Sequence, residues 1–170
     1  ASYMWSRLWG VRAVRHMPLF VSVEPANVCQ LRCPECPVGQ AIERKGTAPR
    51  LMQEQVWQRI LEQVAACAYT IQFYFQGEPL LNPRLPQMIA EAKTKGLYTI
   101  ISTNAQAMTP QMAEQLVSAG LNRIIISMDG ATQHTYEAYR VGGSIEQCKA
   151  AMQWLKEAKK KYNKHTIIEL

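Results

Sequence analysis

The sequence predicts an α/β fold, a partial (β/α) TIM-like barrel of parallel strands, and three observations support this prediction. Short apolar runs alternate with amphipathic stretches, which implies a parallel sheet with right-handed crossovers. The runs are continuously hydrophobic, as in strands that are buried on both faces. Their spacing is regular, since 26 residues separate Ile71 from Leu97 and Leu97 from Arg123.

Five apolar runs are predicted as strands: Leu19–Val23, Thr70–Phe75, Leu97–Ile101, Arg123–Ser127 and Thr166–Leu170. A complete eightfold barrel needs at least about 200 residues, whereas this chain has 170. We therefore expect residues 19–170 to form a core of about four and a half βα units. This core is expected to be truncated at its C-terminal end and to lack part of the substrate-binding residues.

The helices between the strands have recognisable starts. Asn82–Pro83 and Thr109–Pro110 each combine an N-cap residue with proline at the first helical position. Ser144, with Gln147 three residues later, predicts a capping box. A further helix is expected over Met52–Ala66, and its apolar spacing predicts that it buries Val56, Ile60 and Val64.

Composition excludes several classes of protein. The chain is 48% hydrophobic and 19% charged, which excludes a disordered protein. Five cysteines in the whole chain are too few for a disulfide-rich secreted scaffold. No apolar run approaches the ~18 residues of a membrane span, and no signal peptide is visible. We expect a cytoplasmic protein without a transmembrane segment. The net charge of +6 comes with no nucleic-acid-binding signature, so DNA is not an expected partner.

Residues 1–18 are predicted to form a separate basic and aromatic segment. Arg7, Arg12 and Arg15 supply the charge, and Trp5 and Trp9 are four residues apart, on one side of a helix. Such a helix can dock on the barrel or on a further domain. It can also lie on a membrane surface.

Polar residues gather directly after the first four predicted strands. They lie in the segments Cys29–Cys36, Gly77–Pro79, Thr103–Asn104 and Ser127–Gly130. Barrels of this class build their active sites at the carboxyl ends of the strands. We therefore expect these four segments to form one site.

Three thiols, Cys29, Cys33 and Cys36, follow the first strand. Thiolate ligands suit zinc or an iron–sulfur cluster. A structural zinc site is closed by four ligands, and no fourth Cys or His lies nearby, since His16 is 13 residues before Cys29. A four-iron cluster with one open iron is therefore favoured, with zinc and unligated core cysteines as alternatives.

The spacing Cys29-x3-Cys33-x2-Cys36 resembles the signature of the radical S-adenosylmethionine (radical SAM) superfamily, and later segments agree in order. Gln76-Gly77-Glu78-Pro79 resembles the segment that meets the methionine amino group in that family, with Gln76 in place of its first glycine. Ser127-Met128-Asp129-Gly130 resembles the end of the fourth strand, where a serine approaches the cofactor.

Arg140, in Tyr139–Gly143, resembles an arginine that reaches the cofactor in the peptide-modifying branch, whose members often carry a C-terminal SPASM domain. Glu35 occupies a position near the adenine where the family frequently has an aromatic or apolar residue, and Ala105 follows Thr103 and Asn104 where a glycine is common. The resemblance implies cluster ligands at Cys29, Cys33 and Cys36, and cofactor-binding residues at Glu35, Gly77, Glu78, Thr103, Asn104, Ser127 and Arg140. It identifies no catalytic side chain.

The resemblance also implies a reaction. A [4Fe-4S] cluster would bind S-adenosylmethionine, and one electron from reduced flavodoxin or ferredoxin would cleave it to methionine and a 5′-deoxyadenosyl radical. That radical would abstract hydrogen from a substrate, either a peptide or protein or a small molecule, as in an oxidoreductase. The alternative is a non-catalytic scaffold or electron-transfer module that binds zinc or an iron–sulfur cluster.

Overall fold

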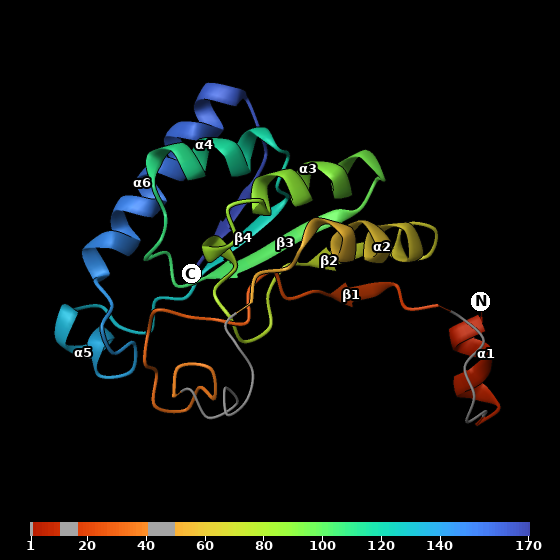
Figure 1. Ribbon diagram of the computed structural model, residues 1–170, viewed down its shortest axis with the longest axis horizontal. Coiled ribbons are helices and arrows are strands. Elements are labelled where there is room, and N and C mark those ends of the chain that lie inside the picture. The colour runs from red at the N-terminus through yellow and green to blue at the C-terminus, as the bar shows by residue number, and fades with distance from the viewer. Residues whose placement is uncertain (1, 11–16, 41–49) are drawn as a thin grey trace.

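A computed structural model describes residues 2–10, 17–40 and 50–170. One parallel sheet runs through the centre of the molecule (Figure 1), and its strands follow the order of the sequence, β1-β2-β3-β4-β5. The strands are β1 (Phe20–Ser22), β2 (Thr70–Gln72), β3 (Tyr98–Thr103), β4 (Arg123–Ile126) and β5 (Ile167–Glu169). This uninterrupted order is that of a (β/α) barrel wall and confirms the predicted fold class.

Helices follow or precede each strand, as the alternation predicts. They are α1 (Ser2–Leu8), α2 (Glu54–Val64), the short 3-10 helix η2 (Pro79–Leu81), α3 (Leu85–Thr94), α4 (Pro110–Ser118), α5 (Gln133–Glu137) and α6 (Ile145–Tyr162). Helices α2, α3, α4 and α6 cover the outer face of the sheet (Figure 1). Within the described ranges, none of the helices has the length and apolar character needed to cross a bilayer.

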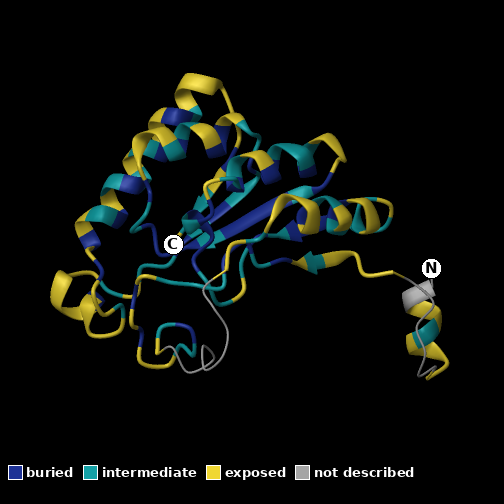
Figure 2. Ribbon diagram, in the orientation of Figure 1, coloured by how far each residue is buried: buried dark blue, intermediate teal, exposed yellow. Residues whose placement is uncertain are grey.

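The two faces of the sheet differ in burial, and β4 shows this clearly. Ile124 and Ile126 are fully buried in the core that the outer helices share, whereas Arg123 and Ile125 are only partly buried on the other face. Figure 2 shows the central strands coloured mostly as buried or intermediate, whereas the covering helices carry many exposed residues. One face of the sheet therefore packs against the outer helices to form the core. The other face is less buried, and the cysteine loop lies near the strand ends on that side.

The helix starts were predicted with mixed success. Thr109 caps α4 as expected, because its side chain accepts a hydrogen bond from Met112 N at 3.0 Å. The N-cap prediction for Asn82 was wrong, since α3 begins at Leu85 and the residue before it is Arg84. Asn82 instead ends η2 and joins it to the first strand's loop, where its amide donates to Pro25 O at 3.0 Å.

The capping box at α6 is only half formed. Ser144 accepts from Gln147 N at 3.3 Å, as predicted. The Gln147 side chain does not return to the cap. It donates to Met108 O at 2.8 Å and to Ala105 O at 3.3 Å, and so braces the loop that follows β3.

The predicted buried face of α2 was partly wrong. Val56 is 48% exposed, and the fully buried residues are Trp57 and Leu61. Trp57 decides this rotation, because its ring packs on Phe73 with centroids 5.3 Å apart and its Nε1 donates to Glu91 Oε2 at 2.5 Å. Burial of the large indole outweighs that of one valine.

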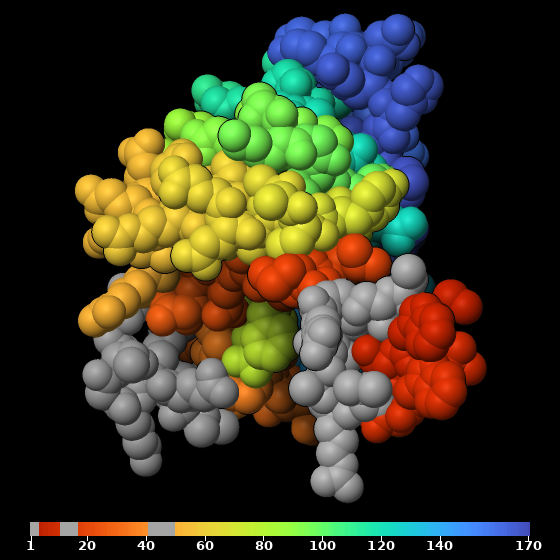
Figure 3. Space-filling model, turned by 90° about the vertical axis from the view of Figure 1, so that its right-hand side faces the viewer, coloured from red at the N-terminus to blue at the C-terminus, as the bar shows by residue number. Residues whose placement is uncertain are grey.

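Helix α1 stands apart from the sheet in Figure 1, and its atoms are the red spheres at the lower right of Figure 3. The Trp5 and Trp9 rings stack with centroids 6.1 Å apart, and both side chains are exposed. Arg12 and Arg15, part of the predicted basic segment, lie outside the described residues. The division into residues 1–18 and 19–170 stays a prediction.

Candidate active site

The carboxyl ends of β1 to β4 surround one cavity of about 380 Å³. Its lining contains all ten residues predicted as cluster ligands or cofactor-binding residues: Cys29, Cys33, Glu35, Cys36, Gly77, Glu78, Thr103, Asn104, Ser127 and Arg140. The volume falls within the roughly 300–1,000 Å³ of small-molecule sites. Four segments far apart in the sequence thus meet at the edge of the sheet where a barrel enzyme places its active site.

The cysteine loop forms one wall of the cavity and is held by backbone contacts. Cys36 N donates to Cys33 O at 3.2 Å, and Arg32 N donates to Val141 O at 3.1 Å. Cys33 is buried, while Cys29 and Cys36 are half-buried. Among the residues that the structure describes, no three His, Cys, Asp or Glu side chains are grouped closely enough to hold a single metal ion.

Gly77 brings the segment after β2 against the loop after β1. A Cβ atom at this position would overlap the Ala26 carbonyl oxygen and would lie within 3.2 Å of Asn27 Cα. Only glycine permits this approach of two backbones. The approach places Gly77 and the cysteine loop on the same cavity.

Glu24 is a residue of this region that the sequence analysis did not single out. Its Oε1 accepts from Gly77 N at 2.6 Å and from Gln76 N at 2.9 Å, so one carboxylate fixes the backbone of the glycine segment. A usable signal was present, because Glu24 directly follows the first apolar run, just as the other site residues follow theirs.

Glu78 links three parts of the site through its buried side chain. Its carboxylate accepts from Thr103 Oγ1 at 2.6 Å, from Asn104 N at 2.8 Å and from Leu80 N at 3.0 Å. Burial raises the pKa of this carboxyl, against the three hydrogen bonds, which lower it. The side chain therefore ties the end of β3 to η2, and its predicted contact with a cofactor stays a prediction.

The hydroxyl groups at the strand ends differ in what they contact. Thr103 Oγ1 is buried, and it also accepts from Ala105 N at 2.9 Å, so its hydrogen bonds lie within the protein. Ser127 is half-buried at the cavity, 3.3 Å from the hydroxyl of Ser102. Glu35 is exposed at the rim. Ser127 and Glu35 both line the cavity, where they can contact a bound molecule.

Two nitrogen donors approach the cysteine sulfurs. Asn104 Nδ2 lies 3.3 Å from Cys29 Sγ, and Arg140 Nη1 lies 3.9 Å from Cys33 Sγ. Burial raises the pKa of the Cys29 thiol, and the neighbouring Glu78 and cysteines raise it further. An N–H donor at this sulfur opposes that effect, because it stabilises the thiolate form that binds metal.

Arg140 is oriented by an ion pair with Asp129, whose carboxylate accepts from Arg140 Nε. Burial lowers the pKa of the guanidinium, but the Asp129 carboxylate outweighs burial and the pKa is raised overall. The site therefore presents a fixed positive charge beside its thiols. Such a charge suits an anionic cluster and the carboxylate of an amino acid.

The residues present fit an iron–sulfur cluster with an organic cofactor. Three thiols line a single cavity, N–H donors face two of the sulfurs, and the glycine segment lines the same space. The family model described as the radical SAM superfamily matches residues 23–168.

The chain belongs to the radical SAM superfamily.

Curated relatives within this superfamily support the assignment. A PqqA peptide cyclase from Xanthomonas oryzae pv. oryzae is 34% identical over 113 residues, which are 65% of this chain and 29% of that protein. An AdoMet-dependent heme synthase from Methanosarcina barkeri is 27% identical over 147 residues, 86% of this chain and 41% of that protein. The radical SAM chain thus spans less than half the length of either relative.

Among solved structures, SuiB of Streptococcus suis bound to its precursor peptide SuiA has a TM-score of 0.71 at 18% identity, over 90% of this chain and 33% of that one. At this identity the likeness establishes the fold, and it confirms the partial barrel. Radical SAM proteins bind a [4Fe-4S] cluster and S-adenosylmethionine, the two cofactors expected from the cysteine spacing and its neighbours. Which side chains contact each cofactor stays a prediction.

Proposed function

We propose that this chain is the catalytic core of a radical SAM enzyme that acts on a peptide. One observation carries the proposal. The three thiols of Cys29, Cys33 and Cys36 share a single cavity with the ends of the next three strands. That geometry provides three cluster ligands and leaves room for a cofactor beside them.

In this proposal Cys29, Cys33 and Cys36 would each hold one iron of the cluster. When S-adenosylmethionine is bound and one external electron is supplied, this group would provide the radical chemistry that takes a hydrogen atom from the substrate, with methionine and 5′-deoxyadenosine as products. The protein orients the cofactor and keeps water away from the radical.

The chain's own residues position the cofactor. The backbone around Gly77, fixed by Glu24, lines the cavity together with the cysteine loop. Arg140, oriented by Asp129, offers its charge to the cofactor's carboxylate. Ser127, at the end of β4, and the exposed Glu35 supply polar groups to the cavity lining.

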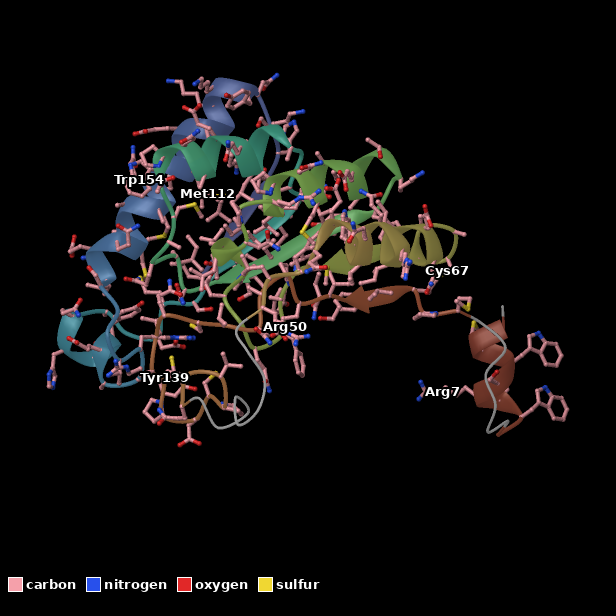
Figure 4. The ribbon with its side chains drawn as sticks, in the orientation of Figure 1. Arg7, Arg50, Cys67, Met112, Tyr139 and Trp154 are labelled. Carbon is pink, nitrogen blue, oxygen red and sulfur yellow. The ribbon has the colours of Figure 1, made fainter. Side chains whose placement is uncertain are left out.

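Anaerobic reconstitution tests the proposal. We expect a brown protein with about four irons per chain that releases 5′-deoxyadenosine when it is reduced with dithionite in the presence of S-adenosylmethionine. Cys33→Ala should lose both properties. Cys67→Ala is the matched control, because Cys67 lies at the end of α2, far from Tyr139 and the cavity (Figure 4). Iron binding without cofactor cleavage would support the non-catalytic module instead.

A peptide is the substrate class that we propose. The support is the likeness to the PqqA peptide cyclase and the presence of Arg140 in a segment that resembles the peptide-modifying branch. The test uses an extract of peptides and small molecules from cells of the organism that makes this protein, grown in deuterated medium. Transfer of deuterium into 5′-deoxyadenosine, abolished by prior protease treatment of the extract, is expected. Transfer that survives the protease would indicate a small molecule.

Reduced flavodoxin or ferredoxin is the electron donor that we propose, in the cytoplasm, where thiols stay reduced. The net charge of +6 favours an acidic partner. The rate of cluster reduction by either protein should fall as salt is added, because screening weakens this attraction. A rate independent of salt would argue against a charge-guided donor.

A further inference from the structure

Asn104 is buried and makes contacts through both its backbone and its side chain, which a simple turn residue does not need. It follows β3, is 5% exposed, and its backbone N–H donates to Glu78 Oε2 at 2.8 Å. Its side-chain Nδ2 lies 3.3 Å from Cys29 Sγ, across 75 residues of sequence. A buried amide thus faces a sulfur that we assign to the cluster.

Two hydrogen bonds determine which end of the amide faces the sulfur. Asn104 Oδ1 accepts from Gln106 N at 2.9 Å and from Gln30 Nε2 at 3.2 Å. A flipped amide would turn its NH₂ group against these two donors and would leave them without an acceptor. The NH₂ group is therefore held toward Cys29 Sγ.

A donor at this position has an electrostatic consequence. One-electron reduction takes the [4Fe-4S] cluster from the 2+ to the 1+ state, with the electron supplied by an external reductant and no bond made or broken. The added negative charge is shared with the cysteine sulfurs, and an N–H donor stabilises it. Hydrogen bonds to sulfur are among the factors that set cluster potentials.

We propose that Asn104 is a positioning residue of the cluster, whose N–H···S contact with Cys29 raises the cluster's reduction potential. This inference rests on the proposed function and deepens it, because it assigns the Asn104 side chain to the cluster rather than to S-adenosylmethionine. Arg140, 3.9 Å from Cys33 Sγ, is a second and longer donor. Asn104 carries the inference because Gln30 and Gln106 determine the orientation of its side-chain amide.

The experiment measures the midpoint potential of the reconstituted chain by a redox titration monitored by electron paramagnetic resonance, without S-adenosylmethionine. Asn104→Asp keeps an oxygen for Gln30 and Gln106 and replaces the donor with an acceptor. Its potential should be more negative than that of the unmodified chain. Asn104→Ser, which withdraws the donor without adding charge, should shift in the same direction by less.

Gln147→Leu is the matched control. It removes the bonds from Gln147 to Ala105 O and Met108 O, and so loosens the same loop without touching the sulfur. Its potential should stay at the value of the unmodified chain. An equal shift in this control, or unchanged potentials in both Asn104 variants, would overturn the inference. If Asn104→Asp fails to bind iron, the Asn104→Ser potential decides.

Failure of the proposed function is detected separately, before any potential is measured. In that case the iron and sulfide contents of the reconstituted unmodified chain do not correspond to a [4Fe-4S] cluster. A chain that binds its cluster with the predicted composition, but whose potential is insensitive to Asn104, would leave the proposed function intact and refute this inference alone.

Discussion

At the scale of single residues, Gly77 cannot carry a side chain without a steric clash, and this predicts the effect of replacing it. Gly77→Ala places a methyl group on the Ala26 carbonyl oxygen, so the loops after β1 and β2 must separate. We expect a loss of about 1–3 kcal/mol in the free energy of unfolding, together with weaker binding of S-adenosylmethionine. Chemical denaturation and calorimetry measure the two effects.

Gly96→Ala is the control for Gly77. Gly96 has φ of +76° but no atom within 4 Å of an added Cβ, and it lies at the end of α3, away from the cavity. It should cost about 1 kcal/mol of backbone strain and leave cofactor binding unchanged. Equal loss of binding in both variants would contradict the steric argument.

Glu24 leads to a second residue-scale prediction. Glu24→Ala leaves Gln76 N and Gly77 N without their shared acceptor. We expect about tenfold weaker binding of S-adenosylmethionine, the usual size of such supporting contacts, measured by calorimetry on the reconstituted protein. Glu24→Gln keeps an oxygen in place and should recover most of the affinity. If it recovers none, the carboxylate acts by charge and not as a backbone acceptor.

At this scale the sequence identifies the residues of the site better than their contacts. The polar segments at the strand ends contain nine of the ten predicted site residues that line the cavity, and the family resemblance added the tenth, Arg140. The contacts of Thr103 and Glu78 with one another were not predictable, because they depend on how closely β2 and β3 approach at their ends. Glu24 was missed although it obeys the same rule.

At the scale of elements, α4 and α6 are joined by an exposed ion pair between Glu114 and Lys161, 2.8 Å apart. The hydrogen bond from Lys161 lowers the pKa of the Glu114 carboxyl. The pKa of this carboxyl is about 4.3 in the unfolded chain and lower in the folded one. The ion pair therefore stabilises the folded state at pH values above the unfolded pKa, and this contribution is lost as the pH falls through the folded pKa.

Glu114→Gln should therefore be slightly less stable than the unmodified chain at neutral pH and equally stable in acid. The difference should shrink in about 1 M salt, where screening is strong. Urea unfolding at both pH values measures it. A difference that grows as the pH falls would show that the sign of this argument is wrong.

Elements with long periodic patterns were predictable, and short or tertiary-determined ones were not. The four outer helices α2, α3, α4 and α6 carry enough apolar residues at helical spacing to be recognised. Helix α5, with five residues, is too short for such a pattern. The rotation of α2 depends on Phe73 and Glu91, which contact Trp57 from elsewhere in the chain.

At the scale of the whole molecule, removal of the cluster should loosen the cysteine loop. When the metal ligands lie on a loop, the free energy of metal binding also stabilises the folded conformation of that loop. Arg32 is exposed between two of the thiols, so trypsin should cut after Arg32 faster in the metal-free protein than in the reconstituted one. Cleavage after Lys95 is the control, because Lys95 is exposed and lies after α3, away from the cysteine loop. Its rate should be the same in both forms of the protein. Equal rates after Arg32 would contradict the coupling.

The sequential strand order has a consequence for biosynthesis. Each strand pairs with its predecessor, so the sheet can grow in the direction in which the ribosome makes it. The cysteine loop is completed early, whereas its partners Asn104 and Arg140 follow Cys29 and Cys33 by 75 and 107 residues. In the nascent chain the thiols are therefore made well before the two side chains that contact them, and this part of the site is completed only with the fourth βα unit.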